Sequence, residues 1–254
     1  FWPGPLTLIL PRRAGVGAAA ASGQDSIGLR CPSHPLALAL LRAAGALGVY
    51  GVAGPSANRF GRVSPTTAAH VQQEFGDALL ILDGGACVVG IESTIVDCSR
   101  GAPVLLRPGV LTPGQIEAAC GCQLLSKEEL QSADVALGAP TPRASGTLEA
   151  HYAPNAKVRL MDAKAIQTAL DLLGADLDRS GARITIYARA ILRSRSAHVL
   201  QRRMPGDAGA TAQQLFAVLR EFDAQGATLI WVETVPDAPE WDGVRDRLRR
   251  ASAA

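Results

Sequence analysis

The sequence predicts an α/β protein of two domains, a mixed twisted sheet followed by a small three-layer parallel sheet. A length of 254 residues with 48% hydrophobic content is enough for two ordinary domains. Short strand patterns crowd residues 1–130, whereas strands and helices alternate regularly in residues 157–254, which is typical of a parallel sheet. Residues 131–156 are rich in Ala, Gly, Pro, Ser and Thr, and this stretch is too long for a connection inside a compact domain, so it is predicted to be a linker.

The first domain is predicted to combine short strands with three helices. Apolar or alternating runs predict strands at residues 5–10, 26–31, 49–53, 78–82, 92–97 and 104–107. Helical patterns cover residues 34–47, 66–75 and 112–119. Ser64 and Pro65 are expected to be the N-cap and first helical residue before helix 66–75. Helix 34–47 is apolar almost all round, so we expect it to be largely buried.

The second domain shows a cleaner alternation. Strands are predicted at residues 158–161, 183–188 and 227–232, and helices at 163–173, 211–222 and 241–250. Each helix has one apolar face, marked by Leu170, Leu219 and Leu248 respectively. This order predicts a small Rossmann-like domain. It contains no Gly-x-Gly-x-x-Gly motif, so no bound dinucleotide is predicted.

Charge and cysteine content exclude several classes of protein. The net charge is +2, and residues 1–139 carry 9 Lys/Arg against 10 Asp/Glu, so the balance does not imply a nucleic-acid partner. The five cysteines form an odd set without a CxxC pair, which predicts reduced, mostly buried thiols rather than disulfides or metal ligands. No apolar run of about 18 residues and no signal peptide is visible, so we expect a cytoplasmic protein without membrane contact.

The loop from Gly54 to Thr66 is the most informative stretch of the chain. It holds paired glycines, prolines, serines and arginines with one asparagine, between an apolar run and a helical pattern. A polar loop that leads into a helix N-terminus is suited to holding an anion. Ser56 and Asn58, two residues apart, face the same way if this part of the loop is extended.

The remaining chemical groups of the first domain agree with an anion site. We find no Ser-His-Asp set, no H-E-x-x-H motif and no paired carboxylates, and His34 and His70 are expected to be ordinary helix residues. Hydroxyls, arginines and one asparagine on loops and strand faces suit a phosphate-rich ligand. The residues alone therefore predict an anion- or nucleotide-binding α/β domain.

Six short motifs together carry a resemblance. In chain order they cover residues 1–7, 27–32, 54–58, 64–66, 91–97 and 106–109. Through them the chain resembles the threonylcarbamoyl-AMP synthase family, whose first domain is of the YrdC type. His151-Tyr-Ala-Pro154 and the small domain after it are similar to the longer, two-domain (Sua) branch. The resemblance covers nearly the whole chain, and six motifs in the right order are specific although each is weak alone.

The resemblance implies an activity. Members of the family are nucleotidyltransferases that condense L-threonine, bicarbonate (or CO2) and ATP to threonylcarbamoyl-AMP and release pyrophosphate. The product serves the threonylcarbamoyladenosine modification of tRNA, so tRNA is a partner only indirectly, through the downstream transferase machinery. Mg²⁺ is expected to accompany the ATP, held chiefly by phosphate oxygens, and no metal site made of protein ligands is expected.

The resemblance also implies which residues form the site. The catalytic residues are Ser56 and Asn58; the ATP-binding residues are Ser26, Ser56, Ser64, Arg107 and Arg143; the threonine-binding residues are Arg30, Gly54 and Ser93. Arg30 can hold the amino-acid carboxylate with two parallel hydrogen bonds. Ser64, at the expected helix start, can offer its hydroxyl to a phosphate. In the linker, Tyr152 and Asn155 join Arg143 as candidate lid contacts.

Each assignment has a structural alternative that the sequence leaves open. Ser64 could be only an N-cap, Ser26 a solvent-facing strand residue, Arg30 and Arg107 surface arginines, Ser93 a residue packed within the sheet, and Ser56 with Asn58 turn formers alone.

Three further expectations concern the whole chain. The first strand and the Lys-x-Arg element of the family are expected upstream of Phe1, and no lysine precedes Lys127, so we expect an N-terminally truncated chain that lacks one wall of the site and is inactive without it. A carbamoyl-adenylate-forming relative is an alternative, although the CxxC pairs usual there are missing. A non-catalytic double-stranded-RNA-binding module is another, in which Arg59 and Arg62 could contact RNA directly.

Overall fold

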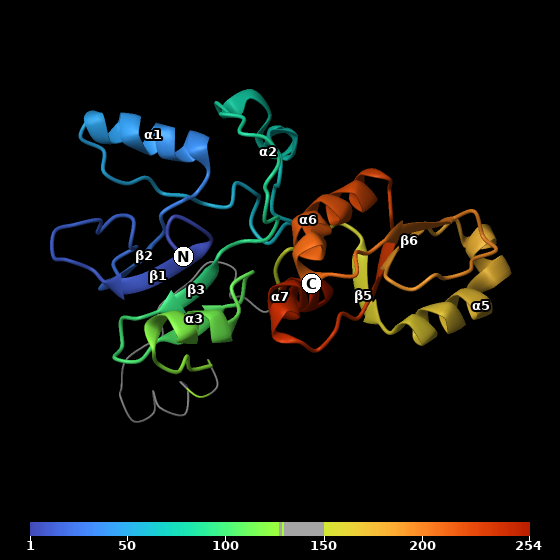
Figure 1. Cartoon of the computed structure of the whole chain (residues 1–254). Coiled ribbons are helices and arrows are strands. Elements are labelled where there is room, and N and C mark those ends of the chain that lie inside the picture. Colours follow the sequence, from blue (N-terminus) through green and yellow to red (C-terminus); the bar gives the residue numbers. More distant parts are fainter. Residues whose placement is uncertain (127–128, 130–149) are drawn as a thin grey trace. The chain divides into compact units, whose positions relative to one another are not determined.

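The computed structural model describes residues 1–126, 129 and 150–254, which form two compact units (Figure 1). The first unit joins Phe1–Pro55 to the stretch that begins at Glu92, and the second joins Ser56–Ile91 to the stretch that ends at Ala254. Segment 56–91 therefore packs with the C-terminal part of the chain, although it lies within residues 1–130 of the sequence. Most of the predicted linker, with Arg143, lies outside the described residues.

The first unit is built on a four-stranded mixed sheet, as predicted. Its strands are β1 (Leu6–Pro11), β2 (Ser26–Leu29), β3 (Thr94–Asp97) and β4 (Val104–Arg107), in the order β2-β1-β3-β4. β1 runs parallel to β3, and the two outer pairs are antiparallel. The register between β3 and β4 shifts by one residue between Ile95 and Val96, which is the mark of a β-bulge.

Apolar side chains pack on both faces of this sheet. One face buries a cluster that includes Ile9 and Leu106. The other buries a cluster that includes Leu6 and Ile116, the latter from α3 (Pro113–Cys120). α3 begins with a capping box, in which the side chains of Thr112 and Gln115 each accept a backbone N–H of the other residue. The predicted helix 112–119 is thereby confirmed.

Three predictions for the first domain are wrong. α1 (Pro35–Ala46) forms where a helix was expected, but none of its residues is buried. Residues 49–53 and 78–82 are not strands, and Leu80 is fully exposed. The three errors have one cause. Apolar composition shows that a segment could be buried or paired, but burial requires a neighbouring surface and a strand requires a neighbouring strand, and neither can be read from the segment itself.

The C-terminal domain is a four-stranded parallel sheet with helices on both sides. Its strands are β5 (Lys157–Met161), β6 (Ile184–Ala188), β7 (Val199–Arg203) and β8 (Leu229–Glu233), in the order β5-β8-β6-β7. Figure 1 shows α5 (Ala163–Ser180) on one side of the strands and α6 (Ala208–Ala224) and α7 (Asp242–Ser252) on the other. The predicted three-layer parallel architecture is confirmed.

The sequence missed β7 and undercounted this sheet by one strand. β7 is an edge strand, and most of its residues are exposed. An edge strand with polar residues carries no apolar run, so the pattern used to find the other strands is absent. Leu170, Leu219 and Leu248 on the predicted inward faces are all buried, whereas Leu173, expected on the same face as Leu170, is 37% exposed.

Two further expectations can be compared with the structure. The five cysteines are free and four of them are exposed, so the prediction of mostly buried thiols is wrong. Cysteine is usually among the most buried residue types, but here these residues lie on loops and at the end of α3. Among the described residues, none of the helices has the length and apolar character needed to cross a membrane.

Candidate functional site

The predicted site residues fall into two groups, one in each compact unit. In the first unit, β3 and β4 bring Ser93 and Arg107 together. The guanidinium of Arg107 donates to the carbonyl oxygen of Ser93 through Nε (3.1 Å) and Nη2 (3.0 Å) and to the Ser93 hydroxyl through Nη2 (3.3 Å). The Ser93 hydroxyl also lies 2.7 Å from that of Thr7 on β1. The result is a connected row of two hydroxyls and one guanidinium.

Burial excludes one of the two interpretations of Arg107, and its contact with ATP stays a prediction. Its exposed fraction is 6%, so the alternative of a surface arginine is wrong. Ser93 is 4% exposed and hydrogen bonded within the sheet, as its structural alternative proposed. Sequence reasoning missed Thr7, although a lone hydroxyl in the middle of an apolar strand is a signal that could have identified it.

Gly109 explains why the motif after β4 ends in glycine. A Cβ atom at Gly109 would lie 2.5 Å from the backbone nitrogen of Thr94 and 2.6 Å from its hydroxyl oxygen. Such a contact is too close for any side chain, so only glycine lets the chain pass this closely over the start of β3. The close approach is made next to Ser93, and it therefore helps to shape the same row of polar groups.

Arg30 and Gly54, two of the three predicted threonine-binding residues, lie side by side. A Cβ at Gly54 would be 3.9 Å from Nη2 of Arg30. Arg30 follows β2 and is exposed, so its guanidinium is open to a ligand carboxylate. Ser26, at the other end of β2, is half-buried and pairs with Pro11 of β1.

In the second unit, Asn58 shapes the loop that carries the predicted catalytic residues. Its side-chain amide donates to the carbonyl oxygens of Arg59 (2.8 Å) and Arg62 (3.2 Å), and Ala57 before it has a positive φ of 54°. Asn58 therefore does stabilise a turn, as its structural alternative proposed. Asn58 Oδ1 is buried and has no hydrogen-bond partner among the described residues, although the amide nitrogen of the same side chain is held by two bonds.

The structure corrects the expected start of the helix after this loop. α2 (Ala68–Phe75) begins with Thr67 as its N-cap, whose hydroxyl accepts from the backbone N–H of His70 at 3.2 Å. Ser64 is therefore not the N-cap, and Pro65 is not the first helical residue. Thr67, which is nearer to the helix and is also a favoured N-cap residue, caps the helix in place of Ser64. Ser64 itself is 4% exposed, more buried than a solvent-facing cap would be.

A cavity of about 190 Å³ opens beside the N-terminus of α2. Ser56, Thr66 and Thr67 line one part of it, and Asp83 and Cys87 another. The backbone N–H of Cys87 donates to the carbonyl oxygen of Thr66 at 2.9 Å and joins the two parts. The first N–H groups of a helix lack partners inside it, so the cavity combines hydroxyls with a weakly positive helix end. Its volume suits a phosphate group better than a whole nucleotide.

His70 holds the backbone just ahead of this helix. Its Nδ1 accepts from the backbone N–H of Thr66 at 3.2 Å, which requires the unprotonated nitrogen. Burial first, and then the positive charge of Arg220, lower the pKa of His70 below its ordinary value of 6.5. The ring is therefore neutral when the loop has this shape, and it acts as a structural acceptor.

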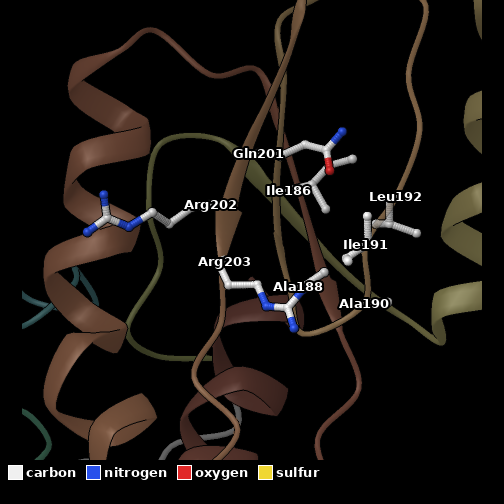
Figure 2. A pocket seen from close by; sticks show the side chains of 8 residues that line it. All are labelled: Ile186, Ala188, Ala190, Ile191, Leu192, Gln201, Arg202 and Arg203. Atoms are coloured by element: carbon white, nitrogen blue, oxygen red, sulfur yellow. The ribbon is translucent and has the colours of Figure 1, made fainter.

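A second cavity, of about 220 Å³, lies in the C-terminal domain at the ends of β6 and β7. Figure 2 shows Arg203 pointing toward Ala188 beside this cavity, whereas Arg202 points away toward α6, where it meets Glu221 at 3.9 Å. None of the predicted site residues lines it.

Two family models match the chain almost end to end. The first, described as telomere recombination, matches residues 1–109, and the second, the C-terminal domain of threonylcarbamoyl-AMP synthase, matches residues 111–253. The chain belongs to the threonylcarbamoyl-AMP synthase family. The predicted resemblance is confirmed, and the second model alone covers more than half of the chain.

Relatives of the family match over the same span. The chain is 34% identical to the threonylcarbamoyl-AMP synthase of Pyrococcus abyssi, over 99% of this chain and 71% of the relative. It is 32% identical to that of Bacillus subtilis, over 99% of this chain and 70% of the relative. The fold matches a crystal structure of P. abyssi Sua5 complexed with L-threonine, with a TM-score of 0.80 and 31% identity, over 99% of this chain and 71% of the other.

Proposed function

We propose that this protein is a threonylcarbamoyl-AMP synthase, which condenses L-threonine, bicarbonate and ATP and releases pyrophosphate. One observation carries the proposal: 99% of the chain matches, at 31% identity and with a TM-score of 0.80, a solved relative that holds L-threonine. Similarity of this extent covers both domains, so it supports the two-domain enzyme and not merely a shared fold.

Threonine recognition would rest on the first unit. Exposed Arg30 beside Gly54 can take the carboxylate in a bidentate pair, and glycine leaves room for the amino acid to approach the guanidinium. The hydroxyl of Ser93, held by Thr7 and Arg107, can orient the polar end of the substrate. These groups bind and orient, and bringing reactants together in this way can supply a large part of the rate.

ATP recognition would rest on the loop and cavity at the start of α2. Ser56, with Thr66 and Thr67, offers hydroxyls beside the N-terminus of the helix, whose dipole favours an anion. The Oδ1 of Asn58 is buried without a partner among the described residues, and it would accept a hydrogen bond from a nucleotide hydroxyl or amine once the loop exposes it. Ser26, Ser64 and Arg107 are retained as ATP-contacting residues on the strength of the family motifs.

A Mg²⁺ ion is proposed to arrive with ATP, bound chiefly by phosphate oxygens. The described residues contain no cluster of three His, Cys, Asp or Glu side chains able to bind a metal. Asp83 is the only carboxylate that lines the cavity by α2, so it would be the single protein ligand beside phosphate oxygens and water. When bound, the ion would neutralise charge on the leaving pyrophosphate.

The test is pyrophosphate release by the full-length gene product. We expect release only when L-threonine, bicarbonate and ATP are all present, with formation of a threonylcarbamoyl-adenylate detected by mass spectrometry. Release without threonine in the presence of carbamoyl phosphate would show the carbamoyl-adenylate-forming relative instead. No release, together with binding of double-stranded RNA that weakens steeply with salt, would show an RNA-binding module.

A further inference from the structure

Helix α6 of the C-terminal domain reaches into the segment that carries Ser64. The guanidinium of Arg220 donates through Nε to the carbonyl oxygen of Ser64 (3.4 Å) and through Nη2 to the carbonyl oxygen of Val63. Nη2 also lies 2.7 Å from Oε1 of Glu74 on α2. One side chain therefore contacts two elements that are about 150 residues away in sequence.

This contact is largely shielded from water. The side chains of Arg220 and Glu74 are 13% and 12% exposed. A guanidinium in such a place needs partners, and the carbonyls of residues 63 and 64 need donors because the helix begins only at Ala68. Arg220 meets both needs at once, and it does so immediately before Pro65 and Thr66, which line the cavity by α2.

Glu74 extends the same contact to the loop of Asn58. While one of its oxygens pairs with Arg220, Oε2 accepts from the backbone N–H of Arg59 at 3.4 Å. Burial would raise the pKa of Glu74, but the hydrogen bond and charge of Arg220, helped by Arg59, lower it below its usual range. The carboxylate of Glu74 therefore stays charged, and it links the loop at Arg59 to helices α2 and α6.

One turn further along α6, Asp223 repeats the pattern. It accepts from the backbone N–H groups of Asn155 (2.8 Å) and Ala156 (3.2 Å). The side chain of Asn155 in turn accepts from Arg62, and the N–H of Ala153 donates to the carbonyl oxygen of Gly61 at 2.8 Å. Through Arg220, and through the contacts that Asp223 makes with the segment at Asn155, α6 is thus linked to residues 61–64 at the C-terminal end of the loop.

We propose that Arg220 and Glu74 are positioning residues for ATP, through which the C-terminal domain sets the shape of the loop carrying Asn58 and Ser64. The inference rests on the proposed function and adds to it a role for the second domain. Arg220 acts by fixing the peptides on either side of Ser64 and does not itself touch the substrate. The C-terminal domain is therefore part of the nucleotide site rather than an independent module.

Kinetics of Arg220→Ala and Arg220→Lys in the full-length enzyme test this. Lysine keeps the charge but has one nitrogen in place of the Nε and Nη2 donors, so it cannot reproduce both contacts, and we expect both variants to raise the KM for ATP about tenfold. The KM for threonine should stay unchanged, because its proposed ligands Arg30 and Ser93 belong to the other unit. Guanidinium ion added at low millimolar concentration should partly restore Arg220→Ala.

Arg202→Ala is the matched control, since it removes an exposed arginine of the same domain that pairs loosely with Glu221. If Arg220→Ala matches Arg202→Ala in the KM for ATP, the inference is wrong. A loss of kcat at unchanged KM values would equally show a structural role only. Should Arg220→Ala fail to fold, Glu74→Gln and Arg220→Lys carry the test, with binding of a non-hydrolysable ATP analogue measured by calorimetry. Failure of the unaltered enzyme to use threonine would instead overturn the proposed function.

Discussion

The strand-borne site residues of the first unit and the loop-borne residues of the second unit are held in place by different means. Ser93 and Arg107 lie on or beside paired strands, and their hydrogen bonds link neighbours in one sheet. Asn58 and Ser64 lie on a loop without regular structure, which the amide of Asn58 holds locally and Arg220 holds from the distant helix α6. The first arrangement depends on one sheet, whereas the second depends on the C-terminal domain being folded and docked on the loop.

The largest expected effect on stability comes from the strand-borne group. Arg107→Ala removes a buried guanidinium and leaves the carbonyl and hydroxyl of Ser93 short of donors. We expect the free energy of unfolding to fall by about 2–4 kcal/mol, measured by urea denaturation. Arg42→Ala, at an exposed arginine on α1, should change it by less than about 0.5 kcal/mol. Equal effects of the two variants would contradict the assigned role of Arg107.

A smaller effect is expected where segment 56–91 meets α6. Gly90 has a positive φ of 81°, and a Cβ there would overlap backbone atoms of Ala212 and Gln213. Gly101 has a similar φ of 89° but open space around it. Both Gly→Ala changes add backbone strain, whereas only Gly90→Ala must also move α6, so we expect it to cost about 2 kcal/mol more.

The measurement for the glycine pair is thermal unfolding combined with the KM for ATP. Gly90→Ala should raise that KM, since it displaces the helix that carries Arg220, and Gly101→Ala should not. If the two variants are alike in both measurements, the loop does not depend on the docking of α6.

The smallest effect concerns pH. His70 accepts from the N–H of Thr66 in its neutral form, and its pKa is lowered by burial and by Arg220. Because the folded-state pKa lies below the ordinary 6.5, this contribution to stability is present above that pH and is lost as the pH falls through it. His70→Gln should therefore remove part of the acid-side decline in the free energy of unfolding, measured between about pH 5 and 8. If His70→Gln leaves the pH dependence of the free energy of unfolding unchanged, protonation of His70 is not linked to folding.

Sequence patterns predicted most of the fold because much of it depends on local signals. The capping residues of α3 and the apolar faces of α6 and α7 are encoded within a few residues, and the structure confirms them. The errors share one cause. α1, the runs at 49–53 and 78–82, and β7 all depend on which surface or strand lies next to them, and a single segment does not contain that information.

The same distinction between local signals and distant contacts applies to the candidate site. Six ordered motifs identify the family and the residue types of the site, because they place hydroxyls, arginines and an asparagine at defined positions in the chain. The folded protein was needed to find that Arg107 is buried against Ser93, that Thr7 joins them, and that Arg220 and Glu74 hold the loop of Asn58 and Ser64. Those contacts join residues 86 to 157 positions apart, or cross between strands, and such distant pairings are created by folding and leave no local pattern in the chain.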